Sequence, residues 1–131
     1  MRVIIIALLA LCVTVISCSR AFVFKVFNNS GQDLIIVSYD GKLVPHEFPV
    51  TAGSAVDVQF PTKLSIIHSR NEWKYDLPRL DKTYEYTRAR GVRVQDIQIE
   101  TNGFIYLLLP KTKEAVHQFP AQPDGFPIIP K

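Results

Sequence analysis

Residues 92–109, VRVQDIQIETNGFIYLLL, form two β-like segments on either side of Asn102-Gly103. Asn-Gly is a preferred pair for a two-residue type I′ hairpin turn, because both residues tolerate positive φ angles. In the first segment the apolar residues change from even to odd positions between Val94 and Ile97. Such a change of parity indicates a β-bulge, which we expect near Gln95-Asp96. The stretch therefore predicts a β-hairpin with one bulged strand.

Short β segments separated by turn residues precede this hairpin. Residues 33–39 contain a continuous apolar run, as expected of a central strand buried on both faces. Asp40-Gly41 predicts a second hairpin. Pro45 and Pro49 lack an amide donor, which places residues 42–50 in an edge strand or a loop. Helical periodicity is nearly absent, so we expect an all-β fold, a small antiparallel β-sandwich of about seven or eight short strands, with a barrel as the alternative.

The C-terminal residues 120–131 hold four prolines and no periodic pattern. This composition predicts polyproline II structure or disorder. A docking tail with Phe126, Ile128 and Ile129 as apolar anchors is one interpretation. We favour the other, a tail packed against the sheet edge or frayed. The expected organisation is a signal peptide over 1–17, a β-sandwich domain over 18–119 and a Pro-rich tail over 120–131.

The N-terminal segment predicts export. Arg2 supplies a positive charge, and an apolar run from Val3 to Ile16 follows, interrupted only by Thr14. As a helix this run would rise about 21 Å, less than the roughly 30 Å hydrocarbon core of a bilayer. A signal-peptide core explains the run better than a permanent membrane span.

The sequence Val15-Ile16-Ser17-Cys18 resembles the lipobox of bacterial lipoproteins: an aliphatic residue, a tolerated residue, a small residue and then cysteine. The resemblance implies cleavage before Cys18, diacylglycerol on its thiol, and an acyl chain such as palmitate on the new amine. The serine after the cysteine resembles lipoproteins sorted to the outer membrane, facing the periplasm. Ordinary secretion is the alternative, with Ser19-Arg20-Ala21 as the cleavage signal. No domain family is identified for the body of the chain.

Charge and cysteine content exclude further classes. The formal net charge is only +3, without the clustered basic face that nucleic-acid binding requires. The densest basic stretch, residues 79–93, is interpreted as a solvated strand-and-turn surface, and contact with anionic lipid or a polyanion is the alternative. Both cysteines, Cys12 and Cys18, lie in the N-terminal segment and none follows Cys18, so the folded body contains no disulfide.

No motif for catalysis, metal binding or cofactor binding is present. His46, His68 and His117 are far apart and show no HxH or HExxH spacing, so we expect no metal site. The chain contains no Gly-x-Ser-x-Gly elbow and no phosphate-binding loop. We therefore expect a protein that is not an enzyme and uses no cofactor.

The weak candidates for ligand binding are aromatic residues on two predicted strands. They would form an exposed platform for sugar or peptide, but alternating aromatic residues more often pack in the core on one face. These candidates are Trp73, Tyr75, Tyr84 and Tyr86.

The function expected from the sequence is that of a non-enzymatic, membrane-anchored lipoprotein of the bacterial cell envelope. It would act as a structural or protein-interaction module and bind an envelope protein through a sheet edge, its loops or the Pro-rich tail. The main alternative is a secreted, soluble β-sandwich that binds carbohydrate or another ligand. A periplasmic hydrolase is the third possibility.

Overall fold

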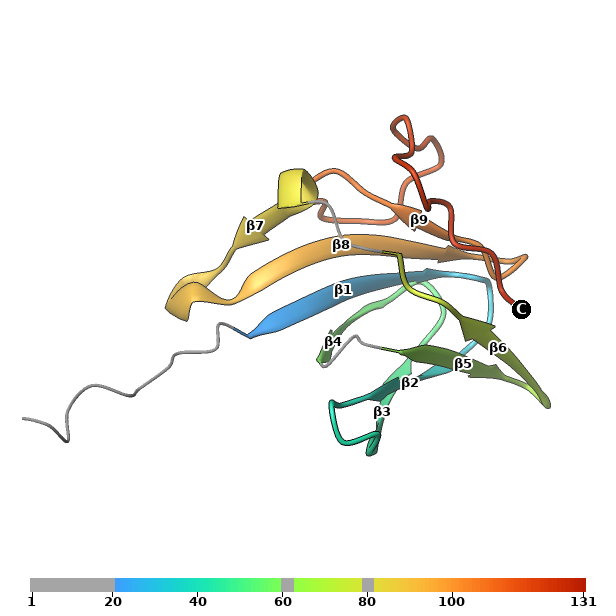
Figure 1. The fold of residues 1–131 in the computed structure, drawn as a ribbon. Coiled ribbons are helices and arrows are strands. Elements are labelled where there is room, and N and C mark those ends of the chain that lie inside the picture. The colour runs from blue at the N-terminus through green and yellow to red at the C-terminus, as the bar shows by residue number, and fades with distance from the viewer. Residues whose placement is uncertain (1–20, 60–62, 79–81) are drawn as a thin grey trace, which may run out of the picture.

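The computed structural model describes residues 21–59, 63–78 and 82–131, which form two packed β-sheets (Figure 1). The predicted signal peptide and Cys18 lie outside the described residues. No helix in the described ranges is long and apolar enough to cross a membrane. The strands are β1 (Phe22–Asn29), β2 (Leu34–Tyr39), β3 (Pro45–Val50), β4 (Ala55–Gln59), β5 (Leu64–His68), β6 (Asn71–Tyr75), β7 (Glu85–Thr87), β8 (Arg93–Glu100) and β9 (Ile105–Leu107), and the 3-10 turns are η2 (Lys82–Tyr84) and η3 (Ala89–Gly91).

The strand order confirms the all-β sandwich. Sheet A has the order β4-β1-β8-β7, with β9 also paired to β8, and sheet B has the order β3-β2-β5-β6. Strands β7 and β9 pair with successive halves of the same edge of β8. All pairs are antiparallel except β1 with β8, which are parallel and far apart in the sequence. The prediction of an antiparallel sandwich is therefore correct apart from this central pair and the strand number, which is nine in the described residues rather than seven or eight.

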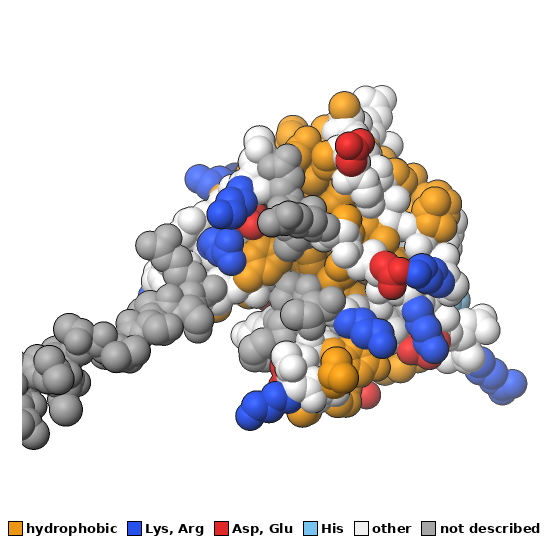
Figure 2. Space-filling view, in the orientation of Figure 1, with side chains coloured by type: hydrophobic (Ala, Val, Ile, Leu, Met, Phe, Trp, Pro, Cys, Tyr) orange, Lys and Arg blue, Asp and Glu red, His pale blue; other side chains and the backbone are white. Residues whose placement is uncertain are grey.

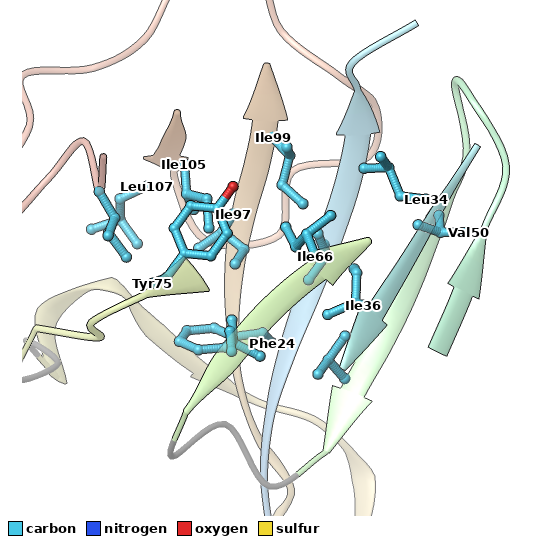
Figure 3. Packing of buried hydrophobic residues seen from close by; sticks show 14 residues of the cluster. Phe24, Leu34, Ile36, Val50, Ile66, Tyr75, Ile97, Ile99, Ile105 and Leu107 are labelled. Atoms are coloured by element: carbon cyan, nitrogen blue, oxygen red, sulfur yellow. The ribbon is translucent and has the colours of Figure 1, made fainter. Parts of the chain in front are cut away.

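The core lies between the two sheets (Figure 3). Sheet A contributes Phe24 and Ile97, and sheet B contributes Ile36 and Ile66, and each of these side chains is at most 1% exposed. Burying large apolar side chains is the main favourable term in folding. One continuous cluster joins both sheets, so the described residues of the two sheets share a single hydrophobic core.

The expected bulge in β8 is absent. The strand pairs with β1 residue by residue from Arg93 to Glu100, without an extra residue on either side. Ile97 and Ile99 face sheet B, while Val94 lies on the opposite face and is also fully buried. The change of apolar parity therefore reflects burial of both faces of β8, which allows apolar residues at either parity.

The predicted hairpin at Asp40-Gly41 connects β2 to β3, and β3 is an edge strand as expected. The Asp40 carboxylate accepts hydrogen bonds from the backbone N–H groups of Lys42 and Val44, at 2.8 and 3.0 Å. The left-handed residue of this turn is Leu43, with a φ of 61°. The turn is thus held by the aspartate side chain, and the positive φ falls later than the Asp-Gly pair suggests.

The second predicted hairpin joins β8 to β9, but its turn is not type I′. Of the Asn102-Gly103 pair, only Gly103 has a positive φ, at 80°, whereas a type I′ turn needs two such residues. A Cβ atom at Gly103 would lie 2.9 Å from the Trp73 ring. Glycine is therefore required here both by the backbone angle and by the close approach of sheet B.

The C-terminal tail packs against the sheet edges, in agreement with the favoured interpretation. Ile128 and Ile105 exchange two backbone hydrogen bonds of 2.8 and 3.0 Å, and Ile128 is 6% exposed. The Lys131 N–H donates to the Lys74 carbonyl at 2.9 Å. Since Ile105 belongs to sheet A and Lys74 to sheet B, the tail links both sheets along one side of the sandwich.

Candidate functional site

The outer face of sheet A is covered by the protein's own chain. Residues 108–119, which we call the strap, cross this face after β9 (Figure 1). The Gln98 side chain exchanges two hydrogen bonds of 2.8 Å with the backbone of Val116. Lys25 donates to the carbonyl of Thr112 at 3.1 Å. This face is therefore occupied and offers little surface to a partner.

A buried carboxylate fixes the strap at its middle. Asp96 is fully buried and accepts hydrogen bonds from the Thr112 N–H at 2.9 Å and the Tyr86 hydroxyl at 3.0 Å. Burial raises the pKa of Asp96, although these two donors and the nearby Lys25 oppose the shift. Tyr86 thus has a structural partner beneath the strap.

The outer face of sheet B differs, because the outward side chains of its edge strands are exposed. Glu47 and Pro49 on β3 and Glu72 and Lys74 on β6 are all exposed. Between them, the central strands present Ile35 and Ile67 and other residues that are partly or fully buried beneath these neighbours. We call this surface the open face, and two hollows lie on it.

The first hollow is polar and has a volume of about 310 Å³. Ser65 and Lys74 lie opposite each other on β5 and β6, and the Lys63 ammonium is 5.5 Å from the centre of the Tyr39 ring. The buried hydroxyl of Ser65 has no hydrogen-bond partner among the described residues. The full lining is Tyr39, Lys63, Leu64, Ser65, Glu72 and Lys74.

The second hollow is mostly apolar and has a volume of about 320 Å³. Its carboxylate, Asp33, already accepts a hydrogen bond from the Ala52 N–H at 2.9 Å. The rest of the lining is aliphatic or small, so this hollow is suited to an apolar side chain. The lining residues are Asp33, Leu34, Ile35, Pro49, Val50, Thr51, Ile67 and Ser69.

The four aromatic candidates do not share one exposed surface. Tyr75 is 2% exposed, and its hydroxyl donates to the Gly103 carbonyl at 2.8 Å. Trp73 packs against the core, and its ring contacts the His68 ring at a tilt of 32°, with 3.7 Å between ring centres. Tyr84 also packs against the core. The Tyr86 hydroxyl donates a hydrogen bond to Asp96, and both residues lie on sheet A, whereas Trp73 and Tyr75 lie on sheet B.

The residues of the open face were not identified from the sequence. They come from four strands, and only the pairing register places Tyr39, Lys63 and Ser65 in one hollow with Lys74. The alternation of Glu72, Lys74 and Asp76 around the aromatic residues was the only available signal. It shows that these charges share a face, but not which residues lie beside them.

The chemistry of the described residues offers no metal site. No group of three or more His, Cys, Asp or Glu side chains in the described ranges is arranged to hold a metal ion. The His46 Nε2 atom lies 3.3 Å from a carboxylate oxygen of Asp40, and no third potential ligand among the described residues joins them. Among the described residues, no base is hydrogen-bonded to Ser65 to activate it as a nucleophile.

The fold and the surface together define a small β-sandwich with one outer face covered by its own strap and the other open. Comparisons with protein-family models, with curated proteins and with solved structures find no match to this chain.

Proposed function

We propose that this protein is a non-enzymatic lipoprotein of the bacterial cell envelope that binds a protein partner through the open face of sheet B. The proposed interaction rests on one contrast: the strap covers the outer face of sheet A, whereas the outer face of sheet B is exposed. The anchor rests on the resemblance of Val15–Cys18 to a lipobox. Cys18 would carry the lipid and hold the sandwich at a membrane, the outer membrane facing the periplasm.

The composition of the open face supports a protein partner. Its apolar hollow, with Ile35, Pro49 and Ile67, lies beside charged residues such as Glu72 and Lys74. Protein interfaces commonly combine an apolar centre with a polar rim. A partner that fills the apolar hollow and pairs with the surrounding charges would match both features.

Docking on the face fits sheet B better than strand addition at its edges. Pro45 and Pro49 lack amide donors on β3, which pairs only with β2 among the described strands. On the other edge, the Lys74 carbonyl of β6 already accepts a bond from Lys131. Both edges therefore offer an incomplete set of backbone groups to an incoming strand.

The anchor is tested by the intact mass of the protein from the membrane fraction of its native host. We expect a mass equal to Cys18–Lys131 plus diacylglycerol and one acyl chain. Cys18→Ala should abolish lipid attachment, because the thiol that receives the lipid is lost. Cys12→Ala is the matched control and should keep the lipid. An unlipidated product that begins at Phe22 would contradict the anchor.

The open face is tested by site-specific photo-crosslinking in the host. A crosslinker at position 67 should give one adduct of discrete mass, and Ile67→Asp without the crosslinker should weaken the same complex. A crosslinker at the exposed Lys113 on the strap is the control. Equal crosslinking at both positions would contradict a specific role for the open face.

The alternative function, a secreted soluble ligand binder, is supported by the polar hollow rather than by the aromatic platform. Tyr39 and Lys63 there offer an aromatic ring and a cation near the Ser65 hydroxyl. Titration with acidic and neutral sugars, followed by NMR at Tyr39, tests this alternative. If saturable chemical-shift changes are seen and the native protein carries no lipid, ligand binding becomes the preferred function.

A further inference from the structure

The start of β1 fixes which end of the sandwich would lie nearest the membrane. Only four residue steps separate Cys18 from Phe22, the first residue of β1. A fully extended chain spans at most about 3.3–3.6 Å per residue, so this distance is at most roughly 14 Å. If Cys18 carries the lipid, as proposed above, this end of the domain is held close to the headgroups.

Three arginines lie at the same end. Phe22 pairs with Arg93, whose backbone N–H donates to the Ala21 carbonyl at 2.9 Å. The turn η3, with Arg88 before it and Arg90 within it, directly precedes β8. Figure 1 shows η3 beside the start of β1, and Figure 2 shows several basic side chains at this end of the domain, with others at the opposite end.

The three arginines differ in whether a carboxylate neutralises their charge. Arg88 pairs with Asp57 at 2.5 Å, and Arg93 pairs with Glu85 at 3.5 Å. Arg90 is exposed and forms no ion pair with another described residue. Arg90 is the middle residue of η3 and has a φ of 65°. Arg90 therefore presents an uncompensated positive charge beside the start of β1.

The β2–β3 turn reaches the same end from sheet B. The Ser38 hydroxyl donates to the Gln59 carbonyl at 2.6 Å, and Gln59 pairs with Val23 near the start of β1. The turn that follows β2 carries exposed Lys42 and Leu43. Leu43 is 71% exposed, the largest value among the large apolar side chains of the described residues.

We propose that this end, formed by the start of β1, η3 and the turn at residues 40–44, rests on an anionic lipid surface. Arg90 and Lys42 would contact the headgroups, and Leu43 with its 47% exposed neighbour Val44 would enter the interface. Basic side chains are attracted to anionic leaflets, and exposed apolar side chains add to peripheral binding. The C-terminus lies at the other end of the domain and would face away from the membrane (Figure 1).

The experiment uses the mature chain Cys18–Lys131 without lipid, so that the anchor does not contribute. Binding is measured by co-sedimentation with vesicles of phosphatidylcholine, alone or mixed with phosphatidylglycerol, at low and high salt. We expect weak binding that requires phosphatidylglycerol and falls with salt. Arg90→Glu should lower the partition coefficient more than fivefold, since each basic residue contributes about that factor. Leu43→Asp should also lower it, and Arg90→Lys should bind like the wild type.

Two matched controls test the location of the contact. Arg70→Glu changes an exposed arginine at the β5–β6 turn, and Ile129→Asp changes an exposed apolar residue near the C-terminus. Neither should alter binding. Absence of vesicle binding, binding that ignores lipid charge, or equal losses in the control variants would each overturn the proposal. The intact mass of the native protein reports on the anchor separately, so the two proposals can fail independently.

Discussion

At the scale of single residues, Asp96 shows how a buried charge can be tolerated for what it holds in place. Its carboxylate is buried beneath the strap and bonded to Tyr86 and Thr112. Desolvation raises its pKa above the ordinary value of 3.8. This role could not be predicted from the sequence, because an aspartate in an alternating strand normally indicates a solvated face. Only the strap, which lies 12 or more residues away in the chain, makes the position a buried one.

The raised pKa predicts a pH-dependent contribution of Asp96 to stability. The native state binds this proton more tightly than the unfolded state does. The ionised Asp96 carboxylate therefore lowers the free energy of unfolding by its full amount at a pH above the native pKa. The cost declines as the pH falls through that pKa and is gone below about 3.8. The free energy of unfolding of the wild type relative to Asp96→Asn should therefore increase from neutral pH towards about pH 3.5.

Urea denaturation of the two proteins across this pH range measures the difference. Asp40, whose pKa is lowered mainly by its hydrogen bond to Val44, has the opposite pH dependence but is present in both proteins. Its contribution cancels in the comparison. If the stability difference between the wild type and Asp96→Asn stays constant with pH, or decreases as the pH falls, the pKa of Asp96 is not raised in the native state.

At the scale of elements, the hairpins follow from local sequence, whereas the tail depends on its surroundings. Asp40-Gly41 and Asn102-Gly103 mark both turns, because turn formation involves only a few neighbouring residues. The tail shows no pattern of its own and becomes ordered by bonding to Ile105 and to Lys74. A segment of this kind cannot be assigned from the sequence, because its backbone partners come from two different sheets.

The tail offers a matched pair of adjacent isoleucines. Ile128 is 6% exposed and packs in the core cluster, while Ile129 is 59% exposed. Ile128→Ala should lower the free energy of unfolding by about 2–4 kcal/mol, since it removes buried methyl groups and leaves a cavity. Ile129→Ala should change it by less than about 0.5 kcal/mol. Chemical denaturation of both variants measures these values, and equal effects would show that the tail does not contribute to the core in solution.

At the scale of the whole molecule, three contacts join the two sheets at the end nearest the C-terminus. Trp73 of sheet B packs against Gly103, and Tyr75 donates a hydrogen bond to the carbonyl of the same glycine. The tail adds a third connection, through Ile128 and Lys131. Because all three contacts accompany one shared core, the sheets are expected to unfold together.

Trp73 provides a probe for this cooperativity, since it is the single tryptophan and lies on sheet B. Its fluorescence and the far-ultraviolet circular dichroism of both sheets should show the same denaturation midpoint and slope, as a two-state transition requires. A fluorescence change at lower denaturant than the circular dichroism change would indicate that sheet B separates first.

The sequence by itself determined the all-β class, the two hairpins and the edge position of β3, because alternation, turn residues and prolines act over short distances. The Val15–Cys18 box likewise lies in consecutive residues, and it supports a proposal about the anchor. Only the tertiary structure decided the parallel pairing of β1 with β8, the covered face of sheet A and the open face of sheet B. These features depend on contacts between residues far apart in the chain. Whether a strand face is buried or exposed is set by the segment that packs on it, and a strand's own residues do not reveal that segment.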